Sequence, residues 1–328
     1  MTKSFQVVGI GNAIVDVISQ ADDSFLDLMG IEKGIMQLVE RNRGEMLYGA
    51  MTNRVQAPGG SVANTLAGLG MLGLTTGFIG RVHDDALGRF YAAEMERDGT
   101  DFVNAPIEGG DLPTSRSMIF VSTDGERSMN TYLGISSEIS SQDVNASVAE
   151  GTEIMFLEGY LYDKDKGKRA FDEAARLTKG SGGKVGISLS DPFCVDRHRN
   201  DFRKFVKEMD FVIGNQHEWE SLYQADLSTA LETAAGECGL VVCTRSGSDV
   251  VLVRGDEEVV VPVERVVPVD TTGAGDQFAT GFIYGYATGQ DLATCGRMGI
   301  TAAAEVISHI GPRPETDLKV LFREKGLI

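Results

Sequence analysis

Residues 152–188, TEIMFLEGYLYDKDKGKRAFDEAARLTKGSGGKVGIS, read as an apolar strand, an amphipathic helix and a second apolar strand. Further along, DFVIGN, QHEWESLYQ and LVVCT (210–224 and 240–244) repeat the alternation. This alternation is typical of βαβ units, in which helices cover both faces of a parallel sheet. The sequence therefore predicts a doubly wound α/β fold with a mostly parallel sheet.

Two segments do not follow the alternation. One combines GIMQLVE (34–40) with NRVQAP (53–58), and the other, residues 115–133, reads as two strands around an Asp124-Gly125 turn. They predict a small antiparallel sheet inserted into the α/β core. Ligands of such folds bind at the carboxyl ends of the parallel strands, so we expect the small sheet to be a lid over that edge. A surface for oligomerisation is the alternative.

The expected division of the chain follows from these two insertions. We expect a large α/β nucleotide-binding domain from residues 1–12, 52–105 and 135–328, and a β lid over the substrate site from residues 13–51 and 106–134.

Composition excludes several classes of protein. The formal net charge of −18 disfavours binding to nucleic acid or to an anionic membrane surface, because both require a basic face. No run approaches the roughly 20 apolar residues of a membrane span, and the N-terminus lacks the pattern of a signal peptide. The four cysteines have neither CxxC spacing nor a disulfide framework. We therefore expect a cytoplasmic protein with reduced thiols.

The stretch PVDTTGAGDQFATGFIYGYATG (268–289) places small residues immediately before an apolar helix. A helix beginning at Gly273-Ala274-Gly275 presents unpaired N–H groups from a loop without bulky side chains, which is a site for an anion such as a phosphoryl group. Asp276 in the first turn either stabilises the helix terminus or accepts the proton of an attacking hydroxyl.

A second cluster lies in APGGSVANTLAG (57–68), where Gly59 and Gly60 precede a helix. The glycines allow a polar ligand to approach the backbone, and Asn64 can bind its hydroxyl groups. A good loop and N-cap would have the same residues. The nearby GLGMLG (68–73) fits GxGxxG but ends a helical run, so it indicates helix packing.

A third cluster is Asn215-Gln216-His217-Glu218, directly after a strand. Asn215 and Glu218 can point the same way and hold a hydrated magnesium ion. A capping box, with Asn215 as the N-cap and Glu218 three residues on, fits equally well.

In this order the clusters resemble the ribokinase-like (pfkB) family of carbohydrate and nucleoside kinases. The resemblance covers essentially the whole chain and depends on GIGNAIVDV (9–17), GGSVAN (59–64), NQHE (215–218) and DTTGAGD (270–276). It implies a ribokinase-like core with a β lid, ATP and Mg²⁺ as cofactors, and phosphoryl transfer to a primary alcohol of a small molecule. Members are monomers or homodimers, so both states stay open.

The resemblance also implies roles for single residues. Asp276 is similar to the catalytic base, and Gly273, Ala274 and Gly275 to the anion hole. Asp16 and Asn12 match the groups that hold sugar hydroxyls, with Gly59, Gly60 and Asn64. Glu218 and Asn215 match the magnesium and phosphate pair, Thr244, Gly247 and His309 the nucleotide contacts, and Asp270 and Thr272 a site for a monovalent cation such as K⁺.

Within the family the closer likeness is to adenosine kinases. It covers residues 11–39, with Gln37 in a lid strand, and the segments LSDPF (189–193) and GERSMNTYL (125–133), in which Arg127 would move toward the transferred phosphate. Tyr160 stands where adenosine kinases tend to carry a phenylalanine that stacks on the base. We therefore expect phosphorylation of adenosine to AMP. The alternatives are a sugar kinase for ribose, fructose or ketodeoxygluconate, and a non-catalytic nucleoside-binding protein.

Overall fold

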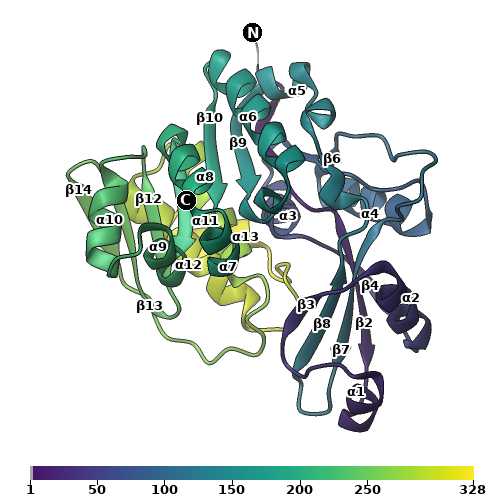
Figure 1. Cartoon of the computed structure of the whole chain (residues 1–328). Helices are drawn as coiled ribbons and strands as arrows, with labels where there is room; N and C mark the ends of the chain where they lie inside the picture. Colours follow the sequence, from purple (N-terminus) through teal and green to yellow (C-terminus); the bar gives the residue numbers. More distant parts are fainter. Residues whose placement is uncertain (1–2) are drawn as a thin grey trace.

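A computed structural model of the protein describes residues 3–328 and contains two sheets (Figure 1). The larger sheet has nine strands in the order β14-β13-β12-β11-β10-β9-β1-β5-β6. Across this sheet, the neighbours β6, β5, β1, β9, β10, β11 and β12 pair in parallel. The pairs β12–β13 and β13–β14 are antiparallel. The strands are β1 (Phe5–Ile10), β5 (Thr76–Ile79), β6 (Thr100–Phe102), β9 (Thr152–Glu158), β10 (Lys184–Ser188), β11 (Phe211–Asn215), β12 (Val241–Arg245), β13 (Ser248–Arg254) and β14 (Glu257–Val261).

Helices cover both faces of this sheet, which confirms the predicted doubly wound fold. Alternate strand residues enter two cores: Val7 and Phe156 lie on one face, and Val8 and Leu157 on the other. The first face carries α3 (Ser61–Met71), α4 (Ala86–Arg97), α11 (Ala274–Ala287), α12 (Leu292–Val306) and α13 (Leu318–Glu324). The second carries α5 (Ala146–Glu150), α6 (Asp165–Gly180), α7 (Pro192–Arg197), α8 (Arg199–Phe205), α9 (Gln216–Tyr223) and α10 (Leu227–Ala235).

The smaller sheet extends away from the larger one in Figure 1 and has the order β3-β8-β7-β2-β4. One of its faces packs on two helices through Val17, Met118, Leu26 and Leu47. Its elements are β2 (Ile14–Gln20), β3 (Met36–Leu38), β4 (Val55–Gly59), β7 (Ser115–Val121) and β8 (Arg127–Tyr132), with helices α1 (Asp23–Met29) and α2 (Arg41–Ala50). The predicted hairpin around Asp124-Gly125 is β7–β8.

Two details of the small sheet differ from the prediction. The sheet is mixed, because β2 pairs with β7 and β3 with β8 in parallel, while β2–β4 and β7–β8 are antiparallel. Separate chain segments supply these strands, so no tight turn fixes their direction. In addition, β4 belongs to the small sheet although it lies in the segment 52–105 assigned to the large part. The division into two domains remains a prediction.

Helix α11 is buried, as its sequence predicted. Phe278, Phe282 and Tyr286 stack along one side, with interplanar angles of 9° and 18°. Another side packs on α3, where a Cβ added to Gly68 would lie 2.6 Å from the Gln277 side chain. The GLGMLG pattern therefore serves helix packing, and α3 and α11 begin side by side.

The strand order changes direction at β1. From β1 the chain adds β5 and β6 on one side and then β9 to β12 on the other. Ligand sites of such sheets lie beyond the carboxyl ends of the strands at this change of direction. In the described part of the chain, none of the helices combines the length and apolar character needed to cross a bilayer.

Candidate active site

Asp16 of β2 presents a carboxylate without a partner. It accepts no hydrogen bond from any residue between 3 and 328. A Cβ added to Gly59 would lie 2.6 Å from its Oδ2, so only glycine leaves room for this carboxylate. Burial raises the pKa of Asp16 to about 7, and the cations Arg127 and Arg313 oppose that shift. Asp16 can therefore accept hydrogen bonds from hydroxyl groups of a ligand.

Asp276 occupies the first turn of α11 and faces the start of α3. Its Oδ1 accepts a hydrogen bond from Ser61 Oγ (2.6 Å), and its Oδ2 accepts one from Asn64 Nδ2 (3.0 Å). Burial raises its pKa to about 6, against the effect of these two donors. The carboxylate is thus ionised near neutral pH and basic enough to accept a proton. Its charge also raises the pKa of Asp16, so the two carboxylates lie near each other, and we call the region around them the cleft.

The turn before α11 leaves backbone donors free. Gly273 is the N-cap with φ 78°, and a Cβ on it would lie 2.6 Å from Pro312 Cα. A Cβ on Gly275 would meet open space. Within residues 3–328, neither the N–H of Gly275 nor that of Asp276 has a hydrogen-bond partner. Two free N–H groups at a helix N-terminus facing open space fit a phosphoryl group.

Arg127 of β8 reaches from the small sheet to the turn before α11. Its Nη1 donates to Asp270 Oδ2 (2.7 Å) and to Thr272 Oγ1 (3.1 Å). Asp270 also accepts from the N–H and hydroxyl of Thr272 and from Gly311 N–H. Both Asp270 oxygens therefore accept hydrogen bonds from the chain, and the monovalent-cation site at Asp270 and Thr272 stays a prediction. Arg127 instead links the small sheet to the anion-binding turn.

Asn12, directly after β1, is held on both sides of its amide. Its backbone N–H and Nδ2 donate to Glu158 Oε1 (3.1 and 2.7 Å), and its Oδ1 accepts from Ser136 Oγ (3.0 Å). Glu158 also accepts from Val62 N–H (3.2 Å), and burial raises its pKa to about 7. One Nδ2 hydrogen of Asn12 remains for a ligand, and Glu158 orients it.

Gln37 lies on the wrong side of the small sheet for its predicted contact. It pairs with Asn130 and donates to Asn130 Oδ1 (2.8 Å). Asn130 shares a face with Met118, which packs on α2, whereas Asp16 points from the opposite face. Neighbours along β3 have opposite orientations, so Leu38 faces the cleft in place of Gln37.

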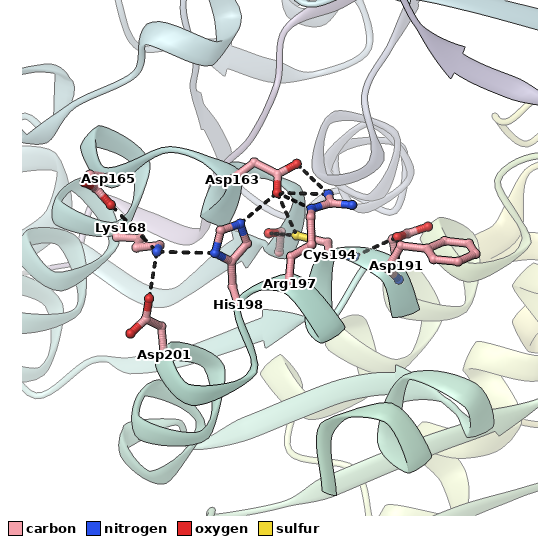
Figure 2. A network of polar contacts seen from close by, with 10 residues as sticks. Asp163, Asp165, Lys168, Asp191, Cys194, Arg197, His198 and Asp201 are labelled. Carbon is pink, nitrogen blue, oxygen red and sulfur yellow. Dashed lines mark hydrogen bonds and ion pairs between the residues drawn. The ribbon is translucent and has the colours of Figure 1, made fainter. Parts of the chain in front are cut away.

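Tyr160 is carried by the 3₁₀ helix η3 (Gly159–Asp163) at the end of β9. Burial raises the pKa of its phenol, and nearby carboxylates, including Asp276, raise it further. Figure 2 shows how η3 is anchored: Arg197 Nη2 lies 2.9 Å from both oxygens of Asp163, and His198 Nε2 lies 2.9 Å from Oδ1. Tyr160 therefore has a fixed place in the neighbourhood of Asp276.

Asn215 and Glu218 form the capping box that was one of the two predictions for this pair. Glu218 accepts from the backbone N–H (2.8 Å) and Nδ2 (2.7 Å) of Asn215. Burial raises its pKa to about 7, and the described chain supplies it with no lysine or arginine partner. Each Glu218 oxygen keeps a further lone pair, which can accept a hydrogen bond from a water ligand of a magnesium ion. A buried carboxylate that has no cationic partner is therefore suited to hold a hydrated magnesium ion nearby. Thr244 lies beside Asn215 on β12.

The other two predicted nucleotide contacts lie in loops. Gly247 (φ 83°) follows Ser246 (φ 42°) in the two-residue turn between β12 and β13, so the hairpin itself requires glycine there. His309 follows α12, with Nε2 3.3 Å from Glu305 Oε2. Both roles remain predictions.

Three residues of the cleft were not among the predicted contacts: Ser61, Glu158 and Arg313. Ser61 stands at the start of a helix, where a serine is common for capping alone. Glu158 had a usable signal, an acidic residue ending a buried parallel strand. Arg313 lies between two prolines in a loop, so no local pattern marks it as a site residue. Only its contact with Asn64 in the folded structure places it near Asp276.

A cavity of about 470 Å³ lies beside β3 and the end of β8, and Ser137, Glu138 and Lys164 of the large part also line it. Asp16, Ser117, Thr131 and Leu38 lie in register on four neighbouring strands, and the last two line this cavity. Strands lie about 4.8 Å apart, so the cavity begins about 10 Å from Asp16. Its lining is Leu38, Val39, Glu40, Arg41, Leu112, Thr131, Tyr132, Leu133, Gly134, Ser137, Glu138 and Lys164.

Comparison with known proteins agrees with this architecture. A model of the pfkB family of carbohydrate kinases matches residues 31–318. A probable sugar kinase protein from Rhizobium etli is 42% identical over the whole of both chains, with a TM-score of 0.91. An adenosine kinase from Sinorhizobium meliloti is 43% identical, with a TM-score of 0.89 over 98% of this chain and 99% of the other. A 5-dehydro-2-deoxygluconokinase from Shouchella clausii is 26% identical over 93% of this chain and 90% of its own length.

Proposed function

This chain belongs to the pfkB family of carbohydrate kinases, and we propose that it transfers the γ-phosphoryl group of ATP to the 5′-hydroxyl of adenosine, forming AMP and ADP. The observation that carries the proposal is the pair Asp16 and Asp276. One is a carboxylate without a partner that can hold hydroxyl groups, and the other is a base beside two free N–H groups. The pair supplies both requirements of phosphoryl transfer to an alcohol, a held acceptor and a proton acceptor.

In the proposed reaction Asp16 accepts hydrogen bonds from neighbouring ribose hydroxyls. Asp276 takes the proton of the 5′-hydroxyl while that oxygen bonds to the γ-phosphorus and the bond to the ADP oxygen breaks. The N–H groups of Gly275 and Asp276 donate to the transferring group and stabilise its charge. Arg127 lies within reach of the same turn, through Asp270 and Thr272.

Two groups bind in addition to the acceptor. ATP supplies the phosphoryl group, and Mg²⁺ neutralises the charge of its phosphates. We propose that Glu218 and Asn215 hold the ion through its water ligands, and that Thr244 on the adjacent strand contacts the nucleotide. The four free and buried cysteines fit a cytoplasmic location, where thiols stay reduced.

The cavity beyond Thr131 supports adenosine over a free sugar. A ribose held at Asp16 would direct its base along the row of Ser117 and Thr131 into this space. Both cations in the lining are already paired: Lys164 Nζ lies 2.7 Å from Glu138 Oε1, and Arg41 Nε lies 2.8 Å from Glu45 Oε1. A neutral base is therefore a better occupant than a carboxylate.

A sugar acid is the second candidate, because a 5-dehydro-2-deoxygluconokinase is among the relatives. Such a substrate carries a carboxylate, and Lys164 could bind it only by giving up Glu138. The ion pair between Lys164 and Glu138 therefore favours adenosine over a sugar acid as the substrate.

An assay of ADP release tests the proposal with adenosine, inosine, ribose, fructose, ketodeoxygluconate and 5-dehydro-2-deoxygluconate. The highest kcat/KM is expected for adenosine. Glu138→Gln should raise kcat/KM for the two sugar acids relative to adenosine, whereas Glu173→Gln, which removes an exposed ion pair on α6, should leave the ratio unchanged. A wild-type preference for a sugar acid would replace the first candidate by the second. Adenosine binding without ADP release from any acceptor would support a non-catalytic protein.

A further inference from the structure

The loop Gly311–Arg313 is attached to the anion-binding turn at several points. Gly311 N–H donates to Asp270 Oδ2 (3.0 Å), and the carbonyl of Pro312 accepts from Gln277 Nε2 (3.0 Å). Pro312 also lies against Gly273. These contacts place the next residue, Arg313, behind the carboxylate of Asp276.

Arg313 is held by groups from two helices. It forms an ion pair with Asp98 at the end of α4, and its Nη2 lies 3.5 Å from Met95 Sδ. Its Nε lies 3.4 Å from Asn64 Oδ1, and Nδ2 of the same amide donates to Asp276 Oδ2 (3.0 Å). The side chain is only 16% exposed. One amide thus lies between a guanidinium and a carboxylate.

This order of charges fixes the orientation of the amide. The Asn64 oxygen can only accept and its nitrogen can only donate, so the oxygen turns to Arg313 and the nitrogen to Asp276. Without the guanidinium, only the hydrogen bond from Nδ2 to Asp276 would orient the amide. The amide and the carboxylate could then move together about this one bond, and Asp276 would be held less firmly.

We propose that Arg313 is a positioning residue of this site, which fixes the amide of Asn64 and so holds the Asp276 carboxylate toward the acceptor hydroxyl. The inference rests on the function proposed above and adds a residue to it. Arg313 acts through Asn64, with its guanidinium bound to Asp98.

Arg313 is also the cation that acts on Asp276. Within residues 3–328, the charge of Asp276 also acts on Asp16 from β2, Glu158 from β9 and Tyr160 from η3, none of which can carry a positive charge. Burial raises the pKa of Asp276 and Arg313 opposes that rise. Removal of the cation should therefore raise the pKa further, whereas a structural ion pair alone would leave it unchanged.

The test follows the titration of the Asp276 carboxyl by ¹³C NMR in aspartate-labelled protein, with the signal assigned by its loss in Asp276→Asn. Arg313→Gln should shift the midpoint upward by about one unit, a tenfold change in proton affinity, and lower kcat at least about tenfold. KM for ATP should be unchanged. Arg313→Lys, which keeps the charge, should restore the midpoint.

Asp98→Asn provides the opposite change, because it leaves the guanidinium charge uncompensated. Its midpoint should move downward, and this variant keeps the inference testable if Arg313→Gln does not fold. Arg203→Gln, which removes a comparable ion pair with Glu237, is the control and should change neither midpoint nor kcat.

Shifts in the same direction for Arg313→Gln and Asp98→Asn, or an unchanged midpoint and kcat with only a lower melting temperature, would overturn the role. The NMR measurement needs no substrate. Failure of the wild-type protein to phosphorylate any acceptor would therefore refute the proposed function alone, and the titration would still decide the role of Arg313.

Discussion

The hydroxyl of Ser61, at the start of α3, donates a hydrogen bond of 2.6 Å to the carboxylate of Asp276, at the start of α11. The two helices pack side by side with their N-termini at the same place, so the site has two helix N-termini and one base between them. This geometry explains why Asp276 stays ionised near neutral pH in spite of its burial, since its hydrogen-bond donors favour the charged form.

Asp276→Asn should lower kcat at least about a hundredfold, because the amide cannot accept the proton of the acceptor hydroxyl. The fold should persist, and circular dichroism will check this alongside the assay of ADP release. Asp226→Asn is the matched control, since Asp226 caps α10 far from the cleft and only stabilises a helix. Similar turnover in the two variants would reduce Asp276 to a helix-stabilising residue.

Gly275→Ala and Gly273→Ala should separate function from stability. At Gly275 a methyl group meets open space, so stability should stay level or rise by about 0.5 to 1 kcal/mol while kcat falls, because the methyl occupies the phosphoryl site. At Gly273, with φ 78° and Pro312 at 2.6 Å, alanine should destabilise the protein by about 1 to 3 kcal/mol. Urea unfolding and the kinase assay measure both, and normal activity of Gly275→Ala would argue against the anion site.

Stability should depend on pH through the buried carboxylates. Burial raises the pKa of Asp16 from 3.8 to about 7, so the folded protein binds more protons than the unfolded chain between these values. The contribution of Asp16 to the free energy of unfolding is fully present below about pH 4, and it is lost as pH rises through about 7. Asp16→Asn should therefore increase the free energy of unfolding at pH 8 by about 1 to 3 kcal/mol and much less at pH 5, while activity is lost.

Urea titrations at the two pH values measure this difference. Asp226→Asn should show no gain at pH 8, because hydrogen bonds lower the pKa of Asp226 in the folded state. An equal effect of Asp16→Asn at both pH values would contradict the assignment of an unpaired buried charge.

The ion pair between Arg127 and Asp270 should hold the small sheet against the turn before α11. Arg127→Gln and Asp270→Asn should each accelerate hydrogen exchange in β7 and β8 and cost about 1.5 to 3 kcal/mol, because each removes a charged, largely buried hydrogen bond. The double variant should cost less than the sum of the two single variants, since both remove the same ion pair.

The pair Lys33–Asp124 at the tip of the same hairpin is the control, because it is more exposed. Lys33→Gln should change the exchange rates little. Additive effects of the two single variants at Arg127 and Asp270 would show that the residues act separately.

The sequence alone determined the layers and the anion-binding turn. The alternation of strand and helix patterns in 152–244 depends only on neighbouring residues, and it predicted the doubly wound sheet. The glycine at 273 likewise marked the start of α11, because the backbone there has φ 78°, a conformation that favours glycine. The hairpin at Asp124-Gly125 was predicted for the same local reason.

The tertiary structure decided which side chains share the cleft. The three-residue strand β3 is too short to show alternation, and a shift of one residue reverses every orientation, so only pairing with β8 showed that Leu38 faces the cleft and Gln37 does not. Arg313 reaches the site through contacts with Asn64 and Asp98, which are distant from it in the chain. Such contacts depend on how whole elements pack, and no local pattern of residues encodes them.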